Sequence, residues 1–237
     1  MIKNLLLLII IFFSSVVNAS ADNLIEKKGI FYLNNDKKPY SGEHLKYENN
    51  ILVTKSMYKD GLKNGYEFNF YPSGEIKIKL FYDNSVQQGQ EIHYYKNSNR
   101  KAIIDYVDGK KEGNMISWYE NGKLLGIAPF KDDHHDGISY SWFDNGSKRA
   151  EGHFAQGHQN GIEIQYYKNG KEKLIGFWKN GKLHGLETQW YENKIKKSEI
   201  FYKEGQVTQD QKFWDKNGKF LKNFNVDDFI KHQKFNH

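Results

Sequence analysis

Residues 113–136 read GNMISWYENGKLLGIAPFKDDHHD, and residues 137–160, which follow directly, read GISYSWFDNGSKRAEGHFAQGHQN. Both segments open on glycine, reach an aromatic pair at the same position and continue through an Asn-Gly turn. Each segment is 24 residues long, so the chain repeats itself with that period. A fixed period of this size is the signature of a repeat architecture, in which each segment folds as one supersecondary unit.

The period extends over most of the 237 residues. Structural glycines recur at the first position of successive repeats, at Gly65, Gly89, Gly113, Gly137, Gly161 and Gly185. An aromatic residue stands five positions after the start of each repeat. We call these residues the first aromatic column: Phe70, Tyr94, Trp118, Trp142, Tyr166, Trp190 and Trp214. The next residues form the second aromatic column, Tyr71, Tyr95, Tyr119, Phe143, Tyr167 and Tyr191. Columns that keep one register identify the repeat as the organising feature of the chain.

Within one repeat the pattern predicts a β-hairpin. Apolar and polar residues alternate along residues 162–166, and alternation with period two indicates a strand with two different faces. Asn-Gly pairs such as Asn180-Gly181 separate the strands, and hairpin turns favour these residues because they reach positive φ at low cost. We therefore predict an all-β fold, an elongated single-layer antiparallel meander of about seven 24-residue hairpins over residues 42–220. Pro129 removes a ladder donor inside a predicted strand, so we expect a bulge, a bend or a strand end there.

The N-terminal segment departs from the repeat. Residues 1–21 have the features of a secretory signal peptide, because Lys3 precedes an uncharged apolar run. Ala19-Ser20-Ala21 then supplies the small residues of a cleavage site, and Asp22 would begin the mature chain. We expect a secreted, cell-surface or periplasmic protein.

The remaining segments flank the array. We interpret residues 22–41 as a lead-in that caps the first hairpin and residues 221–237 as a C-terminal cap. Asn225 is a suitable N-cap, and acidic residues follow it in the first turn, where the helix dipole favours negative charge. The sequence therefore predicts a short capping helix from Asn225 to Phe235.

Composition restricts the chemistry of this protein. Cysteine is absent, which excludes disulfides, thiolate metal sites and cysteine nucleophiles. The formal net charge of +6 comes from 35 basic and 29 acidic residues that are interspersed along the chain, as on a solvated surface. Affinity for anionic lipid, glycan or nucleic acid is the alternative interpretation of the basic charge; among these partners we expect no nucleic acid.

No motif indicates an enzyme, a cofactor site or a metal site. The sequence lacks a Gly-rich phosphate loop, a nucleophile elbow and a His-Glu-x-x-His motif. His134 and His158 share a repeat position, but equivalent positions lie about 10 Å apart, too far to share one Zn²⁺. Glutamate recurs in a further column, at Glu67, Glu91, Glu163 and Glu187. We interpret these residues as solvated, because a periodic row supplies no distinct catalytic pair.

Two stretches resemble a known repeat. Residues 151–161 read EGHFAQGHQNG and residues 176–185 read GFWKNGKLHG, and both are similar to MORN repeats. The unit here is 24 residues long, and other repeats replace one glycine of the motif, for example by Leu80 and Ile104. In both respects the chain is closer to the variant MORN repeats of bacterial proteins. The resemblance implies an elongated, curved, single-layer sheet that serves as a scaffold or interaction surface. It implies no chemistry, because a fold does not carry a function.

The leading functional hypothesis is an exported, non-enzymatic scaffold that binds a protein through the first aromatic column. A one-layer sheet has no second layer to cover that face, so its rings either pack on one another or line a groove. The second aromatic column is expected on the opposite face, more exposed and with its hydroxyls free to hydrogen-bond. The alternatives are a module that binds a membrane surface or cell-wall glycan, and an immunity protein that inhibits a secreted toxin.

Overall fold

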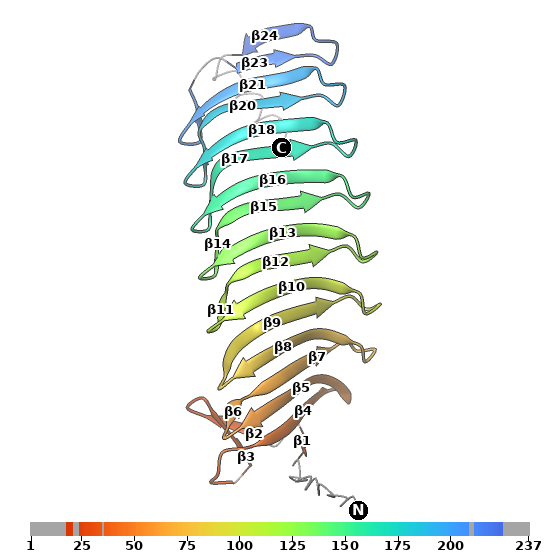
Figure 1. The fold of residues 1–237 in the computed structure, drawn as a ribbon, viewed down its shortest axis with the longest axis vertical. Coiled ribbons are helices and arrows are strands. Elements are labelled where there is room, and N and C mark those ends of the chain that lie inside the picture. Colours follow the sequence, from red (N-terminus) through yellow and green to blue (C-terminus); the bar gives the residue numbers. More distant parts are fainter. Residues whose placement is uncertain (1–17, 21–23, 35, 209–210, 225–237) are drawn as a thin grey trace, which may run out of the picture.

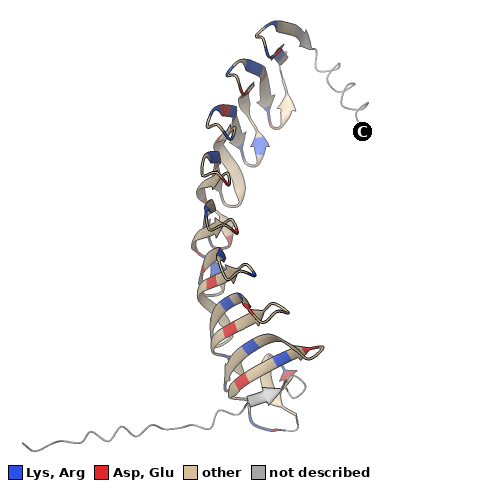
Figure 2. Ribbon diagram, turned by 90° about the vertical axis from the view of Figure 1, so that its right-hand side faces the viewer, with Lys and Arg blue, Asp and Glu red and all other residues tan. Residues whose placement is uncertain are grey.

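The structure is a computed structural model and describes residues 18–20, 24–34, 36–208 and 211–224. Figure 1 shows its strands stacked in a single layer from one end of the chain to the other, and Figure 2 shows that the layer is bent into an arc. Within these ranges the regular structure consists of strands alone, and none of it could serve as a membrane-spanning helix. The predicted all-β, single-layer array is confirmed.

The main sheet has 22 strands, and successive long strands pair as antiparallel hairpins. These hairpins are β4 (Gly42–Glu48) with β5 (Ile51–Lys59), β7 (Gly65–Phe70) with β8 (Ile76–Asp83), β9 (Val86–Tyr94) with β10 (Arg100–Val107), β12 (Gly113–Trp118) with β13 (Leu124–Lys131), β15 (Gly137–Trp142) with β16 (Lys148–Ala155), β17 (His158–Tyr166) with β18 (Glu172–Lys179), β20 (Gly185–Trp190) with β21 (Lys196–Lys203), and β23 (Gln211–Trp214) with β24 (Phe220–Phe224). Short strands extend several of the ladders: β6 (Leu62–Lys63), β11 (Lys110–Lys111), β14 (His134–His135), β19 (Lys182–Leu183) and β22 (Gln206–Val207). The described part of the main sheet thus contains eight hairpins, close to the predicted number.

The segment before the array packs on its first hairpin. Strands β2 (Leu24–Lys27) and β3 (Ile30–Leu33) form a separate hairpin, and the Phe31 N–H donates to the Gly61 carbonyl at 2.9 Å. Tyr40 and Tyr58 form the core cluster of buried residues, with their ring centroids 6.0 Å apart. Strand β1 (Asn18–Ser20), inside the predicted signal peptide, pairs in parallel with β4.

At the C-terminal end the last strand continues further than the sequence indicates. Strand β24 runs to Phe224, so it extends beyond the predicted end of the array at residue 220. The predicted helix from Asn225 lies outside the described residues.

Each repeat makes two different turns, and Asn-Gly occurs at turns of both kinds. At Asn180-Gly181 both residues have positive φ, 49° and 77°, as a type I′ turn requires. At Asn121-Gly122 only the glycine has positive φ, at 80°, and the Asn121 side-chain oxygen accepts the N–H of Lys123 at 3.1 Å. This second geometry is an Asx turn followed by a glycine bulge. We call the two long borders of the sheet the I′-turn rim and the Asx-turn rim, at the left and right of Figure 1.

Pro129 occupies an interruption in the ladder. Strand β13 pairs with β15 at Gly126 and Ile127 and with β14 at Phe130 and Lys131, so Pro129 lies between the two ladders. Its carbonyl accepts the Asp136 N–H at 3.0 Å, and the strand keeps its pairing with β12. The expected irregularity therefore lies between β14 and β15 rather than in the strand that contains the proline.

The glycines at the start of each repeat permit the interruption between successive ladders, because of their backbone conformation. All six have positive φ, for example 117° at Gly137 and 69° at Gly89. A Cβ on Gly137 would also lie 2.8 Å from Cγ of Pro129, whereas a Cβ on Gly89 would meet nothing within 4 Å.

Gly137→Ala and Gly89→Ala therefore separate conformational strain from steric exclusion. We expect Gly89→Ala to lower the free energy of unfolding by about 1 kcal/mol, because only the backbone is strained. Gly137→Ala should lower it by about 2–3 kcal/mol, since strain and the Pro129 contact add. Urea unfolding followed by circular dichroism measures both. Equal losses would contradict a steric role for Pro129.

Candidate functional site

The two faces of the sheet differ in chemistry. Tyr66, Phe68 and Phe70 alternate along β7 with Glu67 and Asn69, so the two sets project from opposite faces. The register carries the division across the strands, because paired residues share a face. We call the face of Tyr66 the apolar face and the face of Glu67 the glutamate face.

The first aromatic column lies on the apolar face along the Asx-turn rim. Every member is half-buried, so the rings are neither sequestered nor fully open. Lys148 lies over the Tyr166 ring at 5.8 Å and Lys196 over the Trp214 ring at 5.4 Å. Both lysines are paired with carboxylates of the same sheet, Lys148 with Glu151 and Lys196 with Glu199. A hollow of about 630 Å³ separates two of the rings and is lined by Tyr166, Asn169, Gly170, Lys171, Glu172, Trp190 and Lys194.

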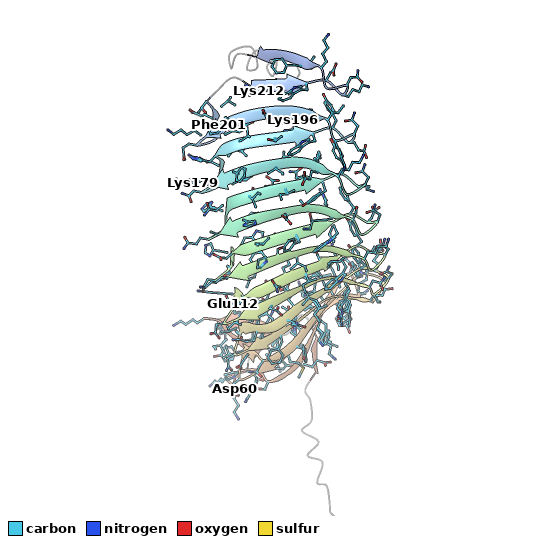
Figure 3. All side chains as sticks on the ribbon, turned by 45° about the horizontal axis from the view of Figure 1, so that its top comes forward. Asp60, Glu112, Lys179, Lys196, Phe201 and Lys212 are labelled. Atoms are coloured by element: carbon cyan, nitrogen blue, oxygen red, sulfur yellow. The ribbon has the colours of Figure 1, made fainter. Side chains whose placement is uncertain are left out.

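Three exposed apolar side chains lie together elsewhere on the same face, near the I′-turn rim. Phe177, Leu186 and Phe201 have exposed fractions of 45%, 40% and 39%. Leu186 is paired with Phe201 across β20 and β21, and Phe177 contacts the neighbouring Gly185 position. We call these three residues the C-terminal apolar patch; Phe201 is labelled in Figure 3. The sequence analysis missed them, although the same period-two alternation places them on the face of the first aromatic column.

The second aromatic column holds successive repeats together. Five tyrosine hydroxyls donate to backbone carbonyls of the first aromatic column in the next repeat: Tyr71 to Tyr94, Tyr95 to Trp118, Tyr119 to Trp142, Tyr167 to Trp190 and Tyr191 to Trp214, at 2.7–3.0 Å. All six members of the column are half-buried. The hydroxyls, which the sequence analysis expected to be available for hydrogen bonding, are thus used within the sheet, and each one satisfies a carbonyl at the end of a strand.

The glutamate column is also covered more than predicted. Glu67 and Glu187 have exposed fractions of only 7% and 8%. Glu67 accepts a hydrogen bond from the Ser56 hydroxyl at 2.8 Å and is paired with Lys63 at 2.5 Å. Glu163 accepts the indole N–H of Trp178 at 2.8 Å. The interpretation of this column as solvated is wrong, because bulky neighbours on the glutamate face cover the carboxylates.

The partners of these carboxylates decide their ionisation. Burial raises the pKa of Glu187, and the charge of Glu163 adds to the effect, while the hydrogen bond from Gln189 opposes it. The hydrogen bond from His93 lowers the pKa of Glu91. Burial also raises the pKa of Tyr58 to about 12. The surroundings of Glu91 favour its ionised form, whereas the surroundings of Glu187 and Tyr58 disfavour ionisation. Each of the three groups lies in a different repeat.

The histidines have structural surroundings. His134 and His158 each cover the second residue of a neighbouring type I′ turn: a Cβ on Gly157 would lie 3.5 Å from His134, and a Cβ on Gly181 would lie 3.5 Å from His158. His135 stacks on the ring of Phe154, with centroids 4.0 Å apart, and burial lowers the pKa of its imidazole. Among the described residues, no group of three or more potential ligands could hold a metal ion.

Comparison with known proteins identifies the repeat. The family described as MORN repeat variant matches residues 63–84, 111–132 and 183–204. The matches begin 48 and 72 residues apart, which are multiples of the 24-residue period, and each covers one hairpin with its Asx-turn loop and ends at the first residue of the following type I′ turn. A search of curated proteins found no match.

One member of the second aromatic column cannot make the shared hydrogen bond. Phe143 occupies the position of the five tyrosines, so the carbonyl of Tyr166 receives no hydroxyl from it. Phe143→Tyr should raise the free energy of unfolding by about 0.5–1.5 kcal/mol, because it adds one inter-repeat hydrogen bond. Tyr119→Phe, the reverse change one repeat earlier, should lower it by a similar amount. Urea unfolding measures both; unchanged midpoints would show that the hydroxyls do not couple the repeats.

Proposed function

Because the chain is a MORN-repeat protein of the variant type, we propose that it is an exported, non-enzymatic scaffold that binds a protein partner on its apolar face. The observation that carries this proposal is the exposure of the C-terminal apolar patch. Monomeric proteins rarely leave contiguous large apolar side chains in water, and such patches mark interaction sites. Aromatic side chains are also enriched where protein interfaces bury them.

Charge on the apolar face supports a protein rather than an anionic membrane as the partner. Lys148 and Lys196 stand over the aromatic rings, but Glu151 and Glu199 on the same face neutralise them. Binding to anionic lipid depends on unneutralised basic side chains. The half-buried first aromatic column then extends the apolar contact area toward the Asx-turn rim.

Repetition supports a binding role over catalysis. A catalytic site brings unlike groups together in one cleft, with pKa values pushed apart for separate tasks. The carboxylates of the glutamate face instead recur at equivalent positions about 10 Å apart. MORN repeats form scaffolds that are often involved in binding, and the family is generally non-enzymatic.

Removal of two aromatic rings tests the apolar face. The partner is identified by crosslinking and mass spectrometry on intact cells, and its Kd is then measured with purified protein. Phe177→Gln combined with Phe201→Gln should weaken binding at least about tenfold, because buried aromatic side chains are the usual hot spots. Val86→Gln combined with Val107→Gln removes exposed apolar side chains away from the patch and should leave Kd unchanged. Equal weakening by both double variants would refute the proposed surface.

Export is tested separately. We expect cleavage after Ala21, so the exported chain should begin at Asp22 and show the corresponding intact mass. Ala21→Glu should block cleavage and retain the precursor at the membrane, because signal peptidase requires a small residue there. Recovery of the uncleaved chain of the unsubstituted protein from the cytoplasmic fraction would contradict export.

A further inference from the structure

Five basic side chains share one repeat position at the Asx-turn rim. We call them the cation column: Lys77, Lys101, Arg149, Lys173 and Lys197. All five are exposed. Within this span the only interruption of the column is Leu125.

The cation column is not neutralised by the protein itself. Within the described part of the chain, no carboxylate lies within ion-pair distance of any of the five side chains, whereas Lys148 and Lys196, each next to a column member in sequence, are both paired. Figure 2 shows both basic and acidic residues recurring along the turns of the array. Other exposed lysines, such as Lys179 and Lys203, are also without an ion pair among the described residues, so the column is distinguished by its regular alignment along one rim.

Aromatic rings accompany the cations. Lys77, Lys101 and Lys173 lie over the rings of Tyr71, Tyr95 and Tyr167, at 6.0, 5.6 and 6.0 Å from the centroids. The cations therefore follow the second aromatic column, away from the rings that Lys148 and Lys196 cover.

A groove runs between two of the cations. It has a volume of about 580 Å³ and is lined by Ser141, Phe143, Arg149, Ala150, Gln165, Tyr166 and Lys173. Arg149 and Lys173 come from adjacent repeats, and Phe143, whose ring also lies under Lys168 at 5.9 Å, lines the same groove. The groove offers an extended ligand both charge and an aromatic contact.

The spacing of the column selects the conformation of that ligand. Equivalent residues of adjacent repeats are two strands apart, which is about 9.6 Å. A polyproline II helix rises about 3.1 Å per residue with three residues per turn, so every third residue recurs after about 9.3 Å on one side. A β-strand recurs on one side after about 6.7 Å and does not match. Aromatic-lined grooves are also the surfaces that recognise polyproline II segments.

We propose that the cation column binds an acidic segment of a partner protein in the polyproline II conformation, with a carboxylate at every third residue. The carboxylates pair with successive cations, and the intervening residues contact the second aromatic column. This site goes beyond the proposed function, because its cations belong to neither the first aromatic column nor the C-terminal apolar patch, although its groove also touches Tyr166.

A synthetic peptide of repeated Pro-Pro-Glu tests the site on the mature chain. Its Kd is measured by fluorescence anisotropy at low salt, against a peptide of identical composition with the glutamates clustered at one end. Arg149→Gln combined with Lys173→Gln should weaken binding of the periodic peptide about fivefold to tenfold, since each exposed ion pair contributes modestly. The matched control is Lys179→Gln combined with Lys203→Gln, which removes the same charge at the I′-turn rim and should change Kd by less than about twofold; Lys179 is labelled in Figure 3.

Leu125→Lys provides a gain-of-function test. Because it fills the interruption in the column, it should tighten binding of the periodic peptide about threefold without affecting the clustered peptide. Phe177→Gln combined with Phe201→Gln should leave peptide binding unchanged, so failure of this site and failure of the apolar face are distinguishable.

Four outcomes would overturn the proposal. These are equal affinity for the clustered and periodic peptides, equal weakening by the two charge-matched double variants, no effect of Leu125→Lys, and displacement of the peptide by vesicles containing anionic lipid. The last outcome would assign the cation column to a membrane surface.

Discussion

Coupling between neighbouring repeats is the constraint on which this structure depends, because a single-layer sheet has no second layer to bury its side chains. Each repeat is therefore secured on both rims as well as by the strand ladders. At the Asx-turn rim, Tyr119 donates to the carbonyl of Trp142 in the next repeat. At the I′-turn rim, the Gly181 N–H donates to the carbonyl of Gln159 in the previous one. These bonds satisfy polar groups at the strand ends, where the ladders no longer do so.

This coupling explains why the columns exist in the sequence. A residue that contacts only its own repeat and the next one faces nearly the same environment in every unit, so the same residue type solves the same problem each time. The ends lack one neighbour and need other contacts. At the N-terminal end, Tyr40 and Phe31 pack on Tyr58 and supply them. The few deeply buried side chains of the array are accordingly small groups between repeats rather than one central core.

The period and the alternation were sufficient to predict the hairpins and the single layer, because both depend on local sequence. They did not predict which polar groups the neighbours cover. The sequence places Glu67 and Glu187 on one face, but their burial depends on how closely adjacent repeats pack. The same limit applies to the hydroxyl of Tyr119, whose acceptor is a backbone carbonyl and leaves no trace in the sequence. Asn-Gly likewise marks two turns without distinguishing Asn121-Gly122, an Asx turn, from Asn180-Gly181, a type I′ turn, since the difference lies in the φ of the asparagine.

Interruptions in the columns matter for binding because a strictly periodic surface does not define a register. A periodic ligand could shift by one repeat along such a surface with no change in its contacts except at the ends, so its binding energy would be nearly equal at several positions. The interruptions concentrate in the middle of the array, where Leu125 breaks the cation column and Phe143 breaks the second aromatic column. A ligand that spans this region meets a cation on either side of Leu125 but no cation at Leu125 itself. Its binding energy therefore differs from one register to the next. The middle repeats therefore supply positional specificity, while the repeats on either side supply most of the contacts.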